Sequence, residues 1–455
     1  MNKYFGTDGF RGKVGTELTA LHAFKIGRFL GHYLSENRAK DSNKPRVVIG
    51  KDTRLSSYAL EYGIASGLTA SGTDVFLMHV ITTPGLTYLT LEDNFDLGIM
   101  ITASHNPYYD NGIKIINSDG EKIDDSLASK IEEYLDSDER TYPLPFSAGS
   151  DIGKIESYLE GREKYVHHLT SLAGISLAGL KVGLDSANGA AFDLSRTIFD
   201  SLGAEVHCIG NTPDGININE GCGSTNIESL SRLVKEKELD VGFAFDGDGD
   251  RCIAVDKGGN IVDGDSIIYI LAKRFLRQGL MKNKTVVTTV MSNGGLLKSL
   301  SNLGVHTEIT KVGDRFVYER MQKTKSILGG EQSGHIIMKK FATTGDGLLT
   351  AITLSREICE LGRPLGELKY GLIVYPQESI SVSVNNKSVV INDEKLSALT
   401  ERIKTELLPN GRLLIRESGT EPKIRIMVEA ESENICESCI SKILSLLKER
   451  GYING

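Results

Sequence analysis

The sequence predicts an α/β protein with three similar mixed α/β domains followed by a smaller α+β C-terminal domain. Three observations carry this prediction. The chain of 455 residues is too long for one ordinary domain. A pattern of strand, helix and strand occurs three times, and the last part of the chain reads as alternating strands before a helix. We place the domains at residues 1–150, 151–255, 256–370 and 371–455.

The internal repeat consists of two apolar strands separated by a helical stretch. Its copies begin at residues 47–49, 182–185 and 286–290. A glycine follows each helical stretch and signals the C-terminal end of a helix: Gly72, Gly203 and Gly304. Strands that alternate with helices favour sheets with parallel character that are covered by helices.

Each copy continues into another apolar strand that ends in a polar loop. The three loops comprise residues 102–107, 246–251 and 329–335. Ligands of open α/β sheets bind beyond the carboxyl ends of the strands, so we expect the loops to converge on one central cleft. Chance similarity of αβ units is the alternative. It does not explain why the loop richest in polar residues follows the corresponding strand in each copy.

The last part of the chain has a different pattern. From about residue 370 we expect a strand at residues 380–384, a strand–loop–strand segment within 413–428 and an amphipathic helix that ends near Arg450. This pattern predicts the smaller α+β domain.

The six cysteines are sparse for this length and do not resemble a disulfide framework. Cys436 and Cys439 form a C-x-x-C pair, which would suit a redox or zinc site. They fall in a helical apolar pattern without a second cysteine or histidine pair, so we favour packing in a core. This cysteine usage favours a reducing, cytoplasmic setting.

Charge and hydropathy exclude two classes of partner. The formal net charge of -8 argues against broad nucleic-acid binding, which needs a basic surface. Residues 1–6 lack an apolar signal core, and no apolar run reaches the roughly 18 residues that suggest a membrane span. We therefore expect neither a nucleic-acid nor a membrane partner.

Three aspartates that alternate with glycines predict a metal site. Asp246, Asp248 and Asp250 would repel one another without a cation, and carboxylate oxygens suit Mg²⁺ or Ca²⁺. An EF-hand calcium loop does not fit, because Arg251 and Lys257 stand at its glycine and glutamate positions. A solvated acidic turn is the alternative.

Ser104 follows a buried-looking strand, where its hydroxyl would suit a nucleophile. Taken alone, such a serine is more often a strand-end cap. The same holds for Lys114, which would neutralise phosphate or move a proton but, alone, is more often a surface lysine.

Two further segments have ligand-binding character. The loop with Glu331, Ser333 and His335 is framed by glycines and suits a hydroxyl-rich ligand, although a tight turn with a structural histidine is the alternative. The segment 416–425 carries two arginines and two hydroxyl groups that would form an anion pocket, and a hairpin with exposed charges is its alternative.

Taken together, the four loops resemble the α-D-phosphohexomutase family, in the family order and over essentially the whole chain. Residues 3–12, 106–114 and 311–315 are similar to the branch that acts on hexosamine phosphates. Gln332 stands where the phosphomannomutase/phosphoglucomutase branch typically has methionine.

The resemblance implies four domains around one deep cleft, activating phosphorylation on Ser104, and Mg²⁺ held by the three aspartates and a phosphoserine oxygen. The groups implied near the transferred phosphoryl group are Arg11, His105, Lys114 and Arg251. The substrate-binding candidates are Lys311, Glu331, Ser333 and His335, with Arg416, Ser418, Gly419, Thr420 and Arg425 around the non-reacting phosphate.

The implied reaction interconverts glucosamine 6-phosphate and glucosamine 1-phosphate through a 1,6-bisphosphate, with Lys114 as general acid and base. It would supply UDP-N-acetylglucosamine synthesis. Members of the family often form homodimers. The alternatives are a phosphomannomutase/phosphoglucomutase, a non-catalytic sugar-phosphate-binding protein and a metal-dependent phosphatase.

Overall fold

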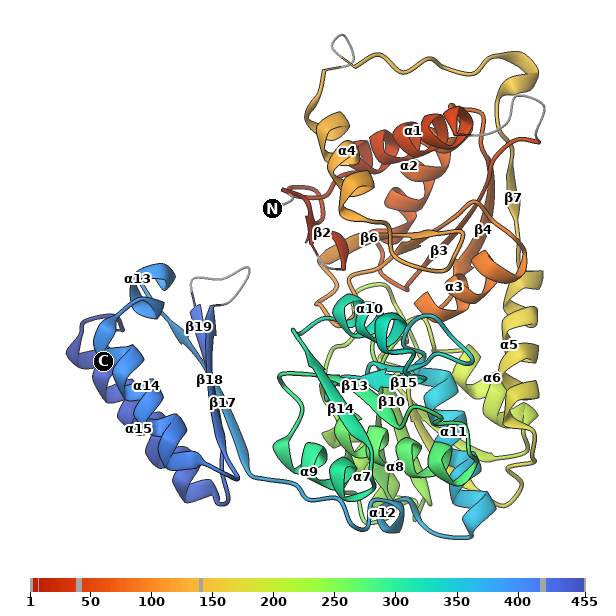
Figure 1. Ribbon diagram of the computed structural model, residues 1–455. Coiled ribbons are helices and arrows are strands. Elements are labelled where there is room, and N and C mark those ends of the chain that lie inside the picture. Colours follow the sequence, from red (N-terminus) through yellow and green to blue (C-terminus); the bar gives the residue numbers. More distant parts are fainter. Residues whose placement is uncertain (1–2, 7, 38–42, 139–141, 418–422, 454–455) are drawn as a thin grey trace. The chain divides into compact units, whose positions relative to one another are not determined.

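The structure of the protein, a computed structural model, describes residues 3–6, 8–37, 43–138, 142–417 and 423–453 (Figure 1). The chain divides into two compact units, residues 1–290 with 308–370 and residues 291–307 with 371–455. The four domain ranges given above stay a prediction. Within the described ranges, no helix is both long and apolar enough to cross a membrane.

The first sheet of the first unit has seven strands in the order β1-β2-β6-β5-β3-β4-β7. The strands are β1 (Phe5–Gly6), β2 (Gly9–Lys13), β3 (Arg46–Lys51), β4 (Asp74–Val80), β5 (Leu97–Ile101), β6 (Asp110–Asn117) and β7 (Ile155–Ser157). The helices are α1 (Ala20–Glu36), α2 (Ser57–Thr69), α3 (Thr83–Glu92) and α4 (Asp125–Asp136), and a 3₁₀ helix follows at Gly149–Asp151. Apolar side chains of β3 and β5 pack with α1, α2 and α4 in one buried cluster.

The second sheet has five strands in the order β12-β11-β10-β8-β9. The strands are β8 (Lys181–Asp185), β9 (Glu205–Ile209), β10 (Val241–Phe245), β11 (Cys252–Asp256) and β12 (Ile261–Val262). The helices are α5 (Glu160–Ala173), α6 (Leu194–Ser201) and α7 (Glu228–Glu236). All five residues of β10 are buried, which fits its continuous apolar run.

The third sheet has four strands in the order β14-β13-β15-β16. The strands are β13 (Thr285–Thr289), β14 (His306–Thr310), β15 (Leu328–Gly330) and β16 (Ile336–Met338). The helices of this part are α8 (Gly264–Arg277), α10 (Asp314–Thr324), α11 (Gly347–Leu361) and α12 (Leu365–Leu368).

These three sheets share one strand order, which confirms the internal repeat. The orders β6-β5-β3-β4, β11-β10-β8-β9 and β16-β15-β13-β14 correspond position by position. The strands β5, β10 and β15 each have a parallel neighbour on one side and an antiparallel neighbour on the other. Each predicted functional loop connects such a strand to its antiparallel neighbour, so the same topological position carries all three loops.

The predicted glycine signals also have the expected backbone. Gly72, Gly203 and Gly304 follow α2, α6 and the helix after β13, and each has a positive φ. Glycine adopts this left-handed region without the steric penalty that a Cβ would add.

The second unit has a three-stranded antiparallel sheet in the order β17-β19-β18. Its strands are β17 (Gln377–Ser383), β18 (Arg412–Glu417) and β19 (Lys423–Glu429), and its helices are α9 (Gly294–Asn302), α13 (Lys387–Ile391), α14 (Glu394–Leu407) and α15 (Glu433–Glu449). The helices α13 and α14 were not expected from the sequence. Cys436 and Cys439 lie in the buried cluster between α14, α15 and the sheet, as the packing interpretation predicts.

Helix α9 shows a difference from the repeat pattern. By chain order it is the helix of the third copy, yet it falls in the second unit. The start of the helix is held by residues of the second unit: the Gly294 N–H donates to Glu429 Oε1 at 2.9 Å, and the Asn293 side chain hydrogen-bonds to the backbone of Tyr375.

Candidate active site

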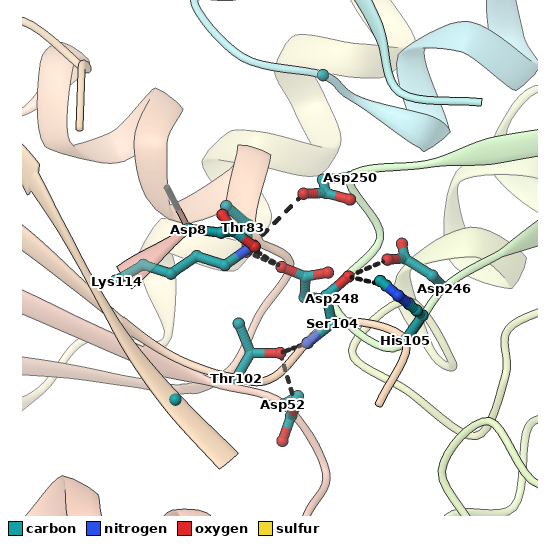
Figure 2. A network of polar contacts seen from close by, with 12 residues as sticks. Asp8, Asp52, Thr83, Thr102, Ser104, His105, Lys114, Asp246, Asp248 and Asp250 are labelled. Carbon is teal, nitrogen blue, oxygen red and sulfur yellow. Dashed lines mark hydrogen bonds and ion pairs between the residues drawn. The ribbon is translucent and has the colours of Figure 1, made fainter. Parts of the chain in front are cut away.

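The structure brings the three functional loops of the first unit together (Figure 2). The Ser104 hydroxyl lies 2.5 Å from Asp246 Oδ2, which joins the first loop to the second. Arg251 and His335 form a backbone bridge, and the Cys252 N–H donates to the Gly334 carbonyl at 3.0 Å, which joins the second loop to the third. The convergence follows from the shared position of the loops in their sheets.

The three aspartates form a buried cluster of carboxylates. One oxygen from each of Asp246, Asp248 and Asp250 lies within 4.8 Å of the others. Burial, together with the charges of Asp250 and Asp248, raises the pKa of Asp246 well above its ordinary value. Oδ1 of Asp248 and Oδ1 of Asp250 are buried and lack hydrogen-bond partners among the described residues.

These properties fit a divalent cation. Buried carboxylate oxygens without a partner are unfavourable unless a charge or a donor compensates them. Oxygen ligands of this kind suit hard cations such as Mg²⁺. The three aspartates therefore have the ligand chemistry of a metal site.

The backbone of the aspartate loop passes very close to the serine loop. A side chain at Gly247 would collide with the Ser104 carbonyl oxygen. Glycine at this position therefore permits the approach that places the carboxylates around the serine hydroxyl.

Ser104 is held in an unusual conformation. Its side chain is 1% exposed, and its φ of 51° lies in the left-handed region that non-glycine residues seldom adopt. The Ser104 N–H donates to Thr102 Oγ1 at 2.9 Å, and Thr102 in turn donates to Asp52 Oδ2 at 2.7 Å. This chain of hydrogen bonds fixes the start of the loop, so the serine hydroxyl faces the aspartates (Figure 2).

His105 also lies next to the serine hydroxyl. Its Nδ1 is 3.3 Å from Ser104 Oγ. Burial and the nearby charges of Arg251 and Arg11 lower the pKa of His105 to about 4. The imidazole is therefore neutral near neutral pH.

Lys114 is buried within the site and is not a surface lysine. Its Nζ donates to Asp248 Oδ2 at 2.7 Å and lies 3.6 Å from Asp250 Oδ2. Burial lowers the pKa of Lys114, but the carboxylates of Asp248, Asp8 and Asp250 outweigh burial and raise it above its ordinary value. Lys114 is thus a charged ammonium that neutralises part of the carboxylate cluster.

Two arginines add positive charge around Ser104. Arg251 Nε lies 3.9 Å from both Asp246 Oδ2 and Asp250 Oδ1, and Arg11 pairs with Asp8. Among the described residues, neither Nε has a hydrogen-bond partner. Both guanidiniums can therefore still donate hydrogen bonds to an anionic ligand.

Several residues of the site were not assigned from the sequence. Thr83 donates to Asp248 Oδ2 at 2.5 Å, and Asp8 lies 3.4 Å from Lys114 Nζ. Lys122 connects Asp8, at 2.5 Å, to Asp314, at 2.7 Å. Asp8 and Asp314 lie in segments whose similarity to the family was noted, and that similarity was the available signal for them.

The candidate sugar-binding residues occupy different environments. Glu331 Oε1 accepts from the Gly313 N–H at 3.0 Å, whereas Ser333 and Lys311 are exposed. His335 is buried, with Nδ1 3.6 Å from Asp250 Oδ2, and its Nε2 accepts from the Gly345 N–H at 3.0 Å. The substrate contacts of all four residues stay predictions, and His335 also supports the metal-ligand candidate Asp250.

The candidate phosphate-binding segment lies in the second unit. Arg416 and Arg425 are opposite each other in the pairing of β18 with β19. Burial and the charge of Arg425 lower the pKa of Arg416, and a bound anion would relieve this repulsion. The three remaining candidates of the segment lie outside the described residues: Ser418, Gly419 and Thr420.

Sequence models of one family match four successive parts of the chain. They are the phosphoglucomutase/phosphomannomutase alpha/beta/alpha domains I, II and III, at residues 2–141, 163–259 and 263–373, and the C-terminal domain, at residues 380–445.

Curated relatives match the whole chain. A phosphoglucosamine mutase from Lachnospira eligens is 47% identical over 452 residues, covering 99% of this chain and 100% of the relative. A phosphoglucosamine mutase from Bacillus subtilis is 46% identical over 448 residues, covering 98% and 99%.

Solved structures share the fold. A phosphoglucomutase/phosphomannomutase family protein from Burkholderia thailandensis has a TM-score of 0.79 and 24% identity, covering 99% of this chain and 98% of its own. An N-acetylphosphoglucosamine mutase from Aspergillus fumigatus, solved in complex with GlcNAc-6P and magnesium, has a TM-score of 0.70 and 16% identity, covering 99% and 96%.

Proposed function

The chain belongs to the phosphoglucomutase/phosphomannomutase family of isomerases, and from this premise we propose that it interconverts glucosamine 6-phosphate and glucosamine 1-phosphate. The observation that carries the chemistry is the buried Ser104 hydroxyl, 2.5 Å from Asp246 in a cluster of three carboxylates. Support for the sugar comes from relatives named phosphoglucosamine mutase that are 46–47% identical over nearly the whole chain.

The metal we propose is Mg²⁺, held by Asp246, Asp248 and Asp250. The buried unpaired oxygens of this cluster support the assignment. When bound, a divalent cation would withdraw charge from a phosphoryl group and offset the carboxylate charge that raises the pKa of Lys114.

In the proposed mechanism, a phosphoryl group on Ser104 passes to the free hydroxyl of the sugar phosphate. The bond between the sugar oxygen and phosphorus forms as the bond between Ser104 Oγ and phosphorus breaks. Lys114 acts in its uncharged form, which a bound cation would favour by offsetting the carboxylate charge. It accepts the proton of the sugar hydroxyl and keeps it until the second transfer, while Ser104 Oγ departs as an alkoxide, so no carboxylate of the metal site has to hold a proton. The guanidiniums of Arg11 and Arg251 stabilise the charge of the transferring group.

The second half of the reaction reverses these steps at the other end of the sugar. The 1,6-bisphosphate turns round, Ser104 Oγ attacks the other phosphorus, and the proton on Lys114 returns to the departing sugar oxygen. Atoms and protons therefore balance, and the enzyme ends in its phosphorylated state. We propose that the segment that contains Arg416 and Arg425 binds the non-reacting phosphate.

The setting we propose is cytoplasmic, with a phosphorylated hexosamine as the substrate and a homodimer as the assembly. The six free cysteines support a reducing compartment. Oligomeric state is directly measurable by light scattering of the purified chain.

The test combines intact mass with a substrate comparison. Purified enzyme should lose or gain one phosphoryl group on Ser104 when it is mixed with substrate, and Ser104→Ala should show neither change. Turnover should be highest with glucosamine phosphates on the same preparation. A preference for mannose 6-phosphate would replace the proposed substrate, and net release of inorganic phosphate would indicate a phosphatase.

A further inference from the structure

The main-chain carbonyls of the Ser104 loop are held from two sides by side chains outside the reacting set. One is Arg54, which follows β3 in the same sheet domain as Ser104. The other is Asn219, which lies between β9 and α7 in the neighbouring sheet domain of the first unit. Neither takes part in the mechanism described above.

Arg54 is fully buried and binds the loop through its guanidinium. Its Nε donates to Asp52 Oδ2 at 2.8 Å, so its charge is paired within the interior. Its other nitrogens donate to the carbonyls of Ser104 at 3.0 Å, Asn106 at 2.8 Å and Asp110 at 3.0 Å, and also to the carbonyl of Pro107.

Asn219 holds the same carbonyls from the neighbouring domain, and we call Arg54 and Asn219 together the carbonyl clamp. Its side-chain amide donates to the Ser104 carbonyl at 2.9 Å and to the Asn106 carbonyl at 3.1 Å. Its own backbone is anchored, because the Asn219 N–H donates to the Ala187 carbonyl at 2.8 Å. Its φ of 60° is left-handed, a conformation that asparagine tolerates better than most residues.

The same amide also lies against the aspartate loop. A Cβ placed on Gly247 would lie 3.0 Å from Asn219 Nδ2. Asn219 therefore lies beside two loops, the loop that carries Ser104 and the loop that carries the carboxylates.

The carbonyl clamp matters because the Ser104 conformation is unfavourable by itself. A left-handed serine persists only when its surroundings impose it, and the direction of Oγ follows from the backbone angles. The Ser104 carbonyl accepts from both Arg54 and Asn219, so both donors oppose rotation of this peptide group. Loss of one donor would remove part of this restraint on the Ser104 backbone, and so on the direction of Oγ.

We propose that Asn219 is a positioning residue for phosphoryl transfer, which holds Ser104 in its left-handed conformation so that Oγ faces the three aspartates. This inference rests on the proposed function, because it assigns Asn219 a part in the same reaction. It acts through Ser104 and does not touch the sugar, so its loss should change kcat and leave KM unchanged.

The test uses Asn219→Asp, which keeps the size and the left-handed tolerance but removes the donor. We expect kcat to fall about 10- to 100-fold, the range for a lost, directional hydrogen bond in a reacting geometry, with KM unchanged. The rate of phosphoryl transfer from isolated phosphoenzyme to substrate, followed by intact mass, should fall by the same factor. The matched control is Asn94→Asp, because Asn94 is also left-handed, with φ 53°, but is exposed and distant in sequence.

A second variant guards against a folding defect. Asn219→Gly removes the amide without adding charge and suits the positive φ, and it should show the same loss of kcat with near-normal thermal unfolding. Wild-type kcat in either folded variant would overturn the inference, as would a rise in KM that accounts for the whole loss. Wild-type enzyme and Ser104→Ala run in parallel: an inactive wild type with glucosamine phosphates would refute the proposed function, independently of Asn219.

Discussion

The two candidate anion-binding regions of the chain differ in how far the described neighbours neutralise their charges. Around Ser104, Lys114 is buried and hydrogen-bonded to Asp248, and Thr83 supports the same carboxylate. In the second unit, Arg416 and Arg425 stand opposite each other with like charge, and Arg425 is exposed. Among the described residues, the charges of the first region are paired within the site, whereas Arg416 stands opposite a second guanidinium.

This difference predicts that changes in the first region lower kcat and changes in the second raise KM. The strongest test is Ser104→Ala. We expect at least about a 10⁴-fold loss of turnover, because the phosphoryl carrier is removed, with an unchanged unfolding temperature. Wild-type-like turnover in this variant, measured with glucosamine 6-phosphate, would refute the mechanism.

Metal removal is the next largest expected effect. Chelation should lower turnover about 100-fold or more, and added Mg²⁺ should restore it, since the carboxylate cluster loses the cation that compensates its charge. The binding isotherm of Mg²⁺ to Asp248→Asn gives an independent readout, and an affinity equal to that of the wild type would contradict the assignment of the ligands.

Replacement of Lys114 tests the buried ammonium. Lys114→Met should lower kcat about 100-fold, within the range for general acid–base groups, because a proton acceptor and a counter-charge are lost together. Lys130→Met on the exposed face of α4 is the matched control. A pH–rate profile identical to that of the wild type would argue against a proton-transfer role.

The second region should respond differently. Arg416→Gln should raise KM about 10-fold and change kcat much less, because a charge-assisted contact with the non-reacting phosphate is lost. Lys404→Gln on α14 provides a control for the loss of one positive charge. Equal losses in kcat and kcat/KM, with KM unchanged, would place Arg416 among the reacting groups instead.

The smallest expected effect is a difference in the pH dependence of stability between the units. Burial raises the pKa of Asp346, in the first unit, to about 6, so its protonated form is favoured by folding. Stability should fall by up to about 3 kcal/mol as pH rises from about 4 to 6, and Asp346→Asn should flatten this slope. Hydrogen bonds from Tyr452, Leu396 and Arg450 lower the pKa of Asp393, in the second unit, so its contribution should instead be lost as pH falls below about 4. Thermal unfolding of both asparagine variants across pH measures the two slopes.

The sequence predicted the repeated fold and the convergence of its loops because both follow from local patterns. The apolar strands and the glycine caps are encoded in adjacent residues, and the topology then brings the loops together. Helix α14 also carries local signals, since Asp393 caps its first turn and Leu396, Ile403 and Leu407 share a buried face. It was therefore predictable from periodicity, although it was not expected.

The contacts that support the site residues could not be predicted from the sequence, because they join residues that are far apart along the chain. Lys114 is a candidate acid or base only in context, and its burial depends on a carboxylate 134 residues away. In the sequence, Arg54 and Asn219 look like ordinary turn residues. Their role depends on hydrogen bonds to backbone carbonyls that are distant in sequence and come close only after folding. The placement of α9 likewise depends on Glu429, which lies 135 residues from Gly294.

The shared strand order of the three sheets has a consequence for how this site is organised. One scaffold position, the turn from a central strand to its antiparallel neighbour, carries the Ser104 loop, the three aspartates and the loop with Glu331 and His335 in the three copies. The candidate site residues are thus divided among three units that share the arrangement of their central strands and differ in the loop at this position.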